Sequence, residues 1–120
     1  GQRAFDEAID GGWLRFVQPD LGKWGGISGC RQVGARAASR GITLCPHWLG
    51  GGVGLAASLH LVVASGSPAS YAEVDANPNP LREDVCPLML DNGIVTLGDA
   101  PGIGVEPDLG RLAHYRVRID

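Results

Sequence analysis

The sequence predicts an α/β fold in which short parallel strands are joined by helices. Segments typical of helices and of strands alternate three times between residues 2 and 74. The strand segments are apolar throughout rather than alternating, as in parallel sheets that are covered on both faces. The 120 residues include 19 glycines, more than twice the average usage of about 7%. This number indicates many short elements separated by turns.

The first predicted unit is a helix followed by a strand. Apolar residues recur on one face of residues 2–10, which is typical of a helix. Gly11 and Gly12 follow it, as glycines commonly follow helices. Residues 13–18 are predicted to form the first strand, which ends at Pro19 because proline cannot continue a central ladder.

Two further units repeat this order. A helix is predicted over residues 27–40, with Gly41 after it, and a strand over residues 42–45 that ends at Pro46. The next predicted helix, residues 53–65, is almost wholly apolar and is therefore expected to be buried on more than one side. Residues 67–70 are predicted to turn the chain into a third strand over residues 71–74.

The pattern changes after Asp75. The Asn-Pro-Asn-Pro run at residues 77–80 cannot lie inside a helix or a central strand. Residues 89–97 are typical of a hairpin that turns at Asp91-Asn92-Gly93. Residues 109–117 fit either a short helix or a strand.

Composition excludes several partner classes. The net charge of −3 offers no basic field for nucleic acid. The longest apolar run, residues 53–64, is shorter than the roughly 20 residues that a membrane span needs. The three cysteines, Cys30, Cys45 and Cys86, contain no Cys-x-x-Cys pair. Free thiols in a reducing cytoplasm are the simplest prediction.

Three ionisable residues follow or end successive predicted strands. Asp20 and His47 each come two residues after a strand, and Glu73 lies near the end of the third. Since the separations are nearly equal, the three side chains are expected at the carboxyl end of the sheet, where α/β folds bind ligands.

These residue types suit proton transfer. We expect Asp20 to accept one ring N–H of His47 and orient it, His47 to act as general base or acid, and Glu73 to contact the far side of a substrate. Each residue alone has an ordinary structural explanation as a loop histidine, a turn aspartate or a solvated glutamate. We predict a structural role for His60, in its apolar helix, and none for His114. The glycines at residues 50–52 fit either an anion site at a helix N-terminus or a flexible turn.

Motifs in a fixed order give the sequence a family resemblance. It resembles the enolase superfamily, and within it the mandelate racemase and acid-sugar dehydratase branch. The motifs extend over most of the chain: Gln18-Pro19-Asp20, Gly25-Gly26-Ile27, Pro46-His47-Trp48, Glu73, residues 77–82 and residues 101–106.

The resemblance implies a modified (β/α)8 TIM barrel, of which this chain is the C-terminal part with about strands 6–8. Residues 1–88 would be the partial barrel, with three βα units. Residues 89–120 would be an extension that packs on a capping domain. Asp20 and His47 would form the dyad that moves the proton α to a carboxylate. Glu73 would hydrogen-bond that substrate, and Trp48 would line its pocket.

The resemblance also implies what lies outside this chain. The family's Mg²⁺ ligands and its lysine motif would lie upstream of Gly1, so no Mg²⁺ is expected to be held here and the fragment alone is expected to be inactive. Its partner would be the missing N-terminal half, or a second copy through exposed sheet edges. The alternative is a non-catalytic, truncated assembly module on the same scaffold.

Overall fold

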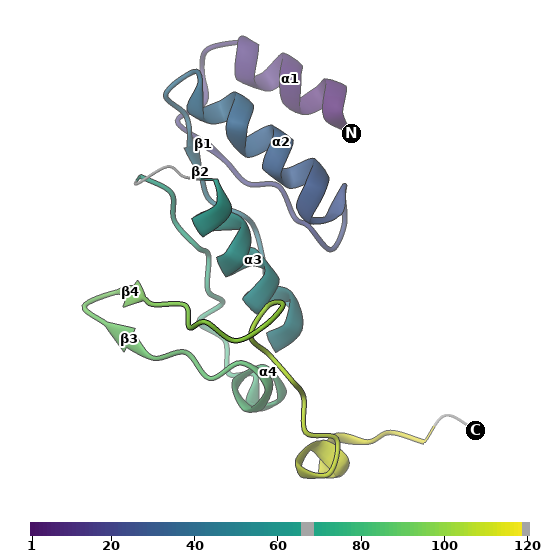
Figure 1. Cartoon of the computed structure of the whole chain (residues 1–120). Coiled ribbons are helices and arrows are strands. Elements are labelled where there is room, and N and C mark those ends of the chain that lie inside the picture. The colour runs from purple at the N-terminus through teal and green to yellow at the C-terminus, as the bar shows by residue number, and fades with distance from the viewer. Residues whose placement is uncertain (66–68, 119–120) are drawn as a thin grey trace.

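The computed structural model describes residues 1–65 and 69–118. Three helices occupy the first half of the chain: α1 (Gln2–Asp10), α2 (Gly26–Ala38) and α3 (Gly52–Ala64). All three were predicted, α1 with these bounds and the other two within two residues. The remaining elements are β1 (Phe16–Val17), β2 (Thr43–Leu44), α4 (Pro80–Val85), β3 (Leu90–Asp91), β4 (Ile94–Val95) and the 3-10 helix η1 (Arg111–Tyr115) (Figure 1).

The predicted parallel pairing of the first two strands is confirmed. Phe16 lies opposite Thr43, and Val17 lies opposite Leu44, in a parallel register. The two chains stay hydrogen-bonded beyond these short strands, because Cys45 N donates to the carbonyl of Val17 at 3.0 Å. The α/β class is therefore correct, although both strands are shorter than predicted.

The predicted third strand over residues 71–74 is wrong, since the structure assigns no strand there. Tyr71 N does donate to the carbonyl of Leu44 at 3.0 Å, which begins a parallel ladder. In a parallel ladder the return bond would come from the backbone N–H of residue 46. That residue is Pro46, which has no N–H. The segment runs beside β2 but cannot complete the pairing.

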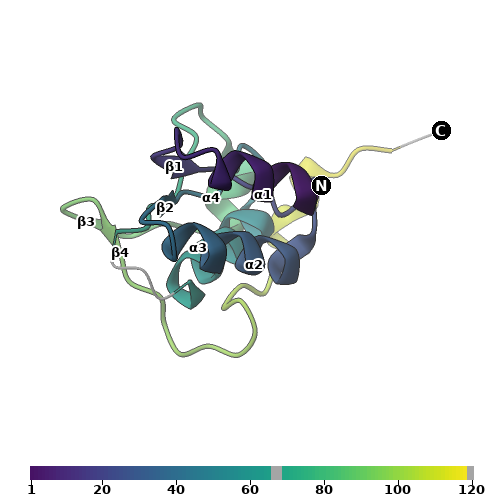
Figure 2. The same ribbon diagram turned by 90° about the horizontal axis from the view of Figure 1, so that it is seen from above.

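Two apolar clusters form the core. The first lies between α1, α2, the two parallel strands and Leu61 of α3. The second lies where α3 meets the later part of the chain. Figures 1 and 2 show α1 beside α2, and Figure 1 shows α3 between these two helices and the C-terminal segments. The buried residues of the first cluster are Ile9, Val17, Cys30, Val33, Ala37, Ile42, Leu44 and Leu61.

The C-terminal elements agree with the sequence in part. β3 and β4 form the predicted antiparallel hairpin, and its turn residues Asn92 and Gly93 have φ of 49° and 79°. Positive φ at both positions is typical of the type I′ turn, which favours Asn-Gly. Helix α4 was not predicted. The turn expected at residues 67–70 falls partly on residues 66–68, outside the described residues, and residues 111–115 form a 3-10 helix.

Candidate active site at the ends of β1 and β2

Asp20 and His47 follow neighbouring strands at the same edge of the sheet, as the sequence predicted. The link is a backbone hydrogen bond in which His47 N donates to the carbonyl of Pro19 at 3.1 Å. This bond continues the β1–β2 pairing past both strand ends. His47 therefore lies opposite the residue that precedes Asp20.

The His47 side chain contacts Glu73. His47 Nδ1 lies 2.5 Å from Glu73 Oε2, and the same oxygen accepts the backbone N–H of Trp48 at 3.2 Å. Both side chains are about one-third exposed. An ionised carboxylate has only acceptors, so this geometry places the ring proton on Nδ1. Within residues 1–65 and 69–118, His47 Nε2 has no hydrogen-bond partner, and it is the nitrogen left for a ligand.

Asp20 is held by its own loop. Its Oδ1 accepts the backbone N–H groups of Gly22 at 2.9 Å and Lys23 at 3.1 Å, and Lys23 Nζ lies 3.1 Å from its Oδ2. Burial alone would raise the pKa of Asp20, but the hydrogen bonds and charge of Lys23, with the Gly22 amide, lower it below 3.8. The structure described here contains no Asp20–His47 hydrogen bond. Sequence reasoning missed Lys23, although its spacing of three residues from Asp20 is a recognisable signal.

Trp48 lies against three glycines. A methyl group added at Gly22 or Gly50 would come within 2.6 Å or 2.7 Å of the indole ring, and one at Gly54 would overlap it. The indole N–H donates to the carbonyl of Gly51 at 2.9 Å. Such close packing requires residues without a side chain.

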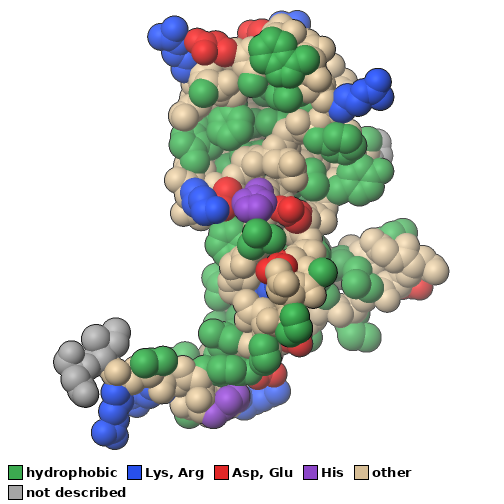
Figure 3. Space-filling view, turned by 180° about the vertical axis from the view of Figure 1, so that it is seen from behind, with side chains coloured by type: hydrophobic (Ala, Val, Ile, Leu, Met, Phe, Trp, Pro, Cys, Tyr) green, Lys and Arg blue, Asp and Glu red, His purple; other side chains and the backbone are tan. Residues whose placement is uncertain are grey.

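A cavity of about 290 Å³ adjoins this cluster. Its lining includes Trp48, Asp20 and Lys23. In Figure 3 a histidine lies between two acidic side chains on one face, with a basic side chain beside one of them. Two of the four predicted site residues, Asp20 and Trp48, line the cavity. Trp48 also connects it to the His47–Glu73 contact, because its backbone N–H bonds to Glu73.

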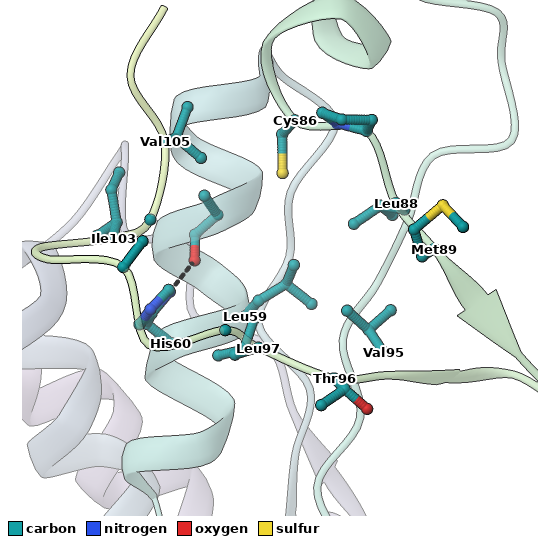
Figure 4. Close-up of a pocket in the computed structure, with 15 residues that line it drawn as sticks. Leu59, His60, Cys86, Leu88, Met89, Val95, Thr96, Leu97, Ile103 and Val105 are labelled. Carbon is teal, nitrogen blue, oxygen red and sulfur yellow. Dashed lines mark hydrogen bonds between the residues drawn. The ribbon is translucent and has the colours of Figure 1, made fainter.

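The other histidines lie elsewhere. His60 lines a mostly apolar pocket of about 200 Å³ between α3 and residues 86–105, and its Nδ1 bonds to the carbonyl of Ala56 at 2.9 Å (Figure 4). His114 is exposed and its Nδ1 bonds to the carbonyl of Arg111. These contacts satisfy one nitrogen of each ring within its own helix. For His60 this agrees with the predicted structural role.

The three cysteine thiols are buried or half-buried. All three cysteines are free, as predicted. Burial and the nearby charge of Asp20 raise the pKa of Cys30 to about 11. Burial and the nearby charge of Glu73 raise the pKa of Cys45. Burial raises the pKa of Cys86. Because the thiolate is the reactive form, none of these residues is a candidate nucleophile.

Neither a metal cluster nor a membrane-spanning helix occurs among the described residues. The described part of the chain contains no group of three His, Cys, Asp or Glu side chains placed to hold a metal ion. Likewise, none of its helices is long and apolar enough to span a bilayer.

Comparison with known proteins places this geometry in a family. The family model described as "Enolase C-terminal domain-like" matches residues 1–111. D-galactarolactone cycloisomerase of Agrobacterium fabrum is 32% identical over 98% of the chain, and arabinonate dehydratase of Saccharolobus solfataricus is 33% identical over 86%. The matches cover 33% and 28% of those proteins, so the chain spans about a third of the relatives' length.

A solved structure agrees with the sequence matches. The mandelate racemase/muconate lactonizing enzyme from Jannaschia sp. CCS1 superposes with a TM-score of 0.80 at 30% identity. The match covers the whole of this chain and 31% of that protein. The chain belongs to the enolase C-terminal domain-like family, in the mandelate racemase and muconate lactonizing enzyme group.

Proposed function

We propose that this chain is the C-terminal part of a longer Mg²⁺-dependent enzyme that moves the proton α to the carboxylate of an acid sugar. Dehydration, racemisation or cycloisomerisation would follow from the same first step. One observation carries the proposal. His47 is fixed through Nδ1 by a carboxylate, while Nε2 has no partner among the described residues at the ligand-binding edge of an α/β sheet.

The residue roles follow from this arrangement. His47 removes or delivers the proton, Asp20 orients its ring, Glu73 hydrogen-bonds the substrate and Trp48 lines the pocket. Because Nδ1 can hold only one carboxylate at a time, Asp20 must leave Lys23 and replace Glu73 before it can take the orienting role. This exchange would turn the Glu73 side chain toward the substrate while the backbone stretch that carries it stays in place.

The proposed partner is the N-terminal part of the same protein. Several aromatic side chains near the strands are exposed: Trp13 by 72%, Phe16 by 52% and Tyr71 by 60%. Exposed apolar groups at a sheet edge favour a covering partner. We propose that residues 1–88 contribute strands 6–8 of a (β/α)8 barrel, and that residues 89–120 pack on a capping domain.

The Mg²⁺ of this proposal does not fit the residues described in this chain, which form no three-ligand cluster. We therefore propose that its ligands come from the N-terminal part, and that the 120 residues alone do not turn over substrate. No step of the mechanism above depends on a metal contact within this chain.

Exchange of the α proton in D₂O tests the function. The longer protein, supplied with Mg²⁺ and aldonic or aldaric acids, is expected to exchange this proton, and His47→Asn is expected to abolish the exchange. His114→Asn is the matched control, since His114 is exposed and far from the candidate site in sequence. Wild-type exchange in His47→Asn would refute His47 as the base.

The alternative, a non-catalytic assembly module, draws on the same exposed aromatic side chains. It makes a different prediction about the gene. An open frame upstream of Gly1 that encodes a capping domain and carboxylate-bearing strand ends supports the enzyme. A stop codon or an unrelated domain there supports the module.

A further inference from the structure

The stretch that carries Glu73 has almost no backbone anchoring. It leaves β2 at the Tyr71–Leu44 hydrogen bond and reaches α4 at Asn79. Between these points, residues 72–78 make no backbone-to-backbone hydrogen bond with any described residue. Because unpaired backbone is free to move, side-chain contacts must fix where Glu73 lies.

Two carboxylates, Glu73 and Asp75, tie this stretch to the rest of the fold. Glu73 contacts His47 and the backbone of Trp48, while the Asp75 side chain is only 14% exposed and lies 3.7 Å from the Arg82 guanidinium. Arg82 Nη2 also donates to the carbonyl of Asn77 at 3.0 Å. Arg82 thus holds the same short stretch at two places, both within four residues of Glu73.

Arg82 is itself fixed and buried. The residue is 6% exposed, and its backbone N–H donates to Asn79 Oδ1 at the start of α4. Helix α4 packs on the first residue of α3, since a methyl group at Gly52 would lie 2.7 Å from the Arg82 carbonyl. A buried guanidinium needs a facing charge. Asp75 provides one that is largely buried, and the exposed Glu83 carboxylate also lies 3.7 Å from Arg82. Nη1 has no hydrogen-bond partner among the described residues, so the pair is held by charge.

We propose that Arg82 is a positioning residue that fixes Glu73 at His47 through Asp75 and Asn77. It does not touch the reacting atoms. Its guanidinium holds the stretch that places the Glu73 carboxylate between the His47 ring and the Trp48 amide. This inference rests on the proposed function for its kinetic consequence, but its structural consequence at His47 can be measured without substrate.

The test uses Arg82→Met and Arg82→Lys in the longer protein. ¹⁵N chemical shifts of the His47 ring report whether Nδ1 still carries the bonded proton. Arg82→Met is expected to shift the ring toward mixed tautomers and to lower kcat for α-proton exchange by at least about tenfold, as small misplacements of catalytic groups do. Arg82→Lys keeps the positive charge that faces Asp75. It is therefore expected to retain part of the native His47 shifts and part of the native kcat.

Arg36→Met is the matched control. Arg36 joins α1 to α2 through Asp6 and Asp10, so its loss removes an ion pair away from the candidate site. It is expected to lower the melting temperature without changing the His47 shifts. If Arg82→Met does not fold, Asp75→Asn removes the Asp75 charge and leaves Glu83 at 3.7 Å from Arg82 Nη2, and it is expected to shift the same His47 signals.

The outcomes separate the two proposals. Unchanged His47 shifts in Arg82→Met, or in Asp75→Asn where Arg82→Met does not fold, overturn the positioning role even if the enzyme is active. Shifts that change in a protein without exchange activity support the positioning role and count against the proposed function.

Discussion

His47 Nδ1 lies 2.5 Å from Glu73 Oε2, across 26 residues of sequence. The contact forms although the segment that contains Glu73 does not pair as a strand. A single backbone hydrogen bond from Tyr71 to Leu44 brings the segment beside β2. The Glu73 carboxylate there contacts the His47 ring and accepts the backbone N–H of Trp48. At this edge of the sheet, side-chain hydrogen bonds therefore hold the Glu73 segment in place, because the segment lacks the backbone pairing of a strand.

Glu73→Gln is expected to loosen the His47 ring. The amide keeps an acceptor, but it loses the charge that makes the present bond strong. In the longer protein, the ¹⁵N shifts of His47 should therefore move toward a mixture of tautomers. Glu7→Gln is the control, because the exposed Glu7 side chain pairs with Arg3 on α1, away from the candidate site. Identical His47 shifts in wild type and Glu73→Gln would contradict the contact.

Lys23→Met is expected to raise the pKa of Asp20. Lys23 supplies a hydrogen bond and a charge that lower this pKa in the native protein. A carboxyl group whose pKa is lowered by folding adds stability above its unfolded value, near 3.8, and loses it as the pH falls through the folded value. The ¹³C shift of the Asp20 carboxyl group, followed from pH 7 to pH 2 in wild type and in Lys23→Met, gives the pKa of Asp20 in each protein.

The stability effect of Lys23→Met has the same pH window. Because Lys23 is 76% exposed, the pair is expected to contribute less than about 1 kcal/mol. The difference in unfolding free energy between wild type and variant should be present at pH 6 and shrink as the pH falls below 3.8. A difference that grows on acidification would contradict this assignment.

Gly54→Ala is expected to destabilise the protein although alanine favours helices. In an open helix position the change would stabilise by roughly 0.5–1 kcal/mol. At Gly54 the added methyl group overlaps the Trp48 ring, and such overpacking costs about 1–3 kcal/mol. Thermal unfolding and the indole N–H signal of Trp48 measure the effect.

Gly51→Ala provides the matched comparison for Gly54→Ala. A methyl group at Gly51 meets nothing within 4 Å, and its φ of −72° suits any residue. The carbonyl that binds the Trp48 indole stays in place. If both variants unfolded at the same temperature, Trp48 would not occupy the position described.

Local sequence predicted the helices because their signals are local. Apolar spacing indicated α1, α2 and α3, and Asn92-Gly93 indicated the hairpin turn, since positive φ at both positions restricts the residue types. Helix α4 was missed although its signal is also local. Asn79 caps it by accepting the N–H of Arg82, and Pro80 occupies the first helical position, where its missing N–H costs nothing.

The sequence by itself determined that Asp20 and His47 follow adjacent parallel strands. The spacing of the apolar segments and the prolines that end them are local features of the sequence. Only the tertiary structure decided which carboxylate meets the imidazole. Asp20 is captured by amide groups two and three residues away and by Lys23, which are always within its reach. Among the described residues, Glu73 has no such local donors. It contacts His47 instead, because the stretch that carries it passes beside β2 and is fixed on α4.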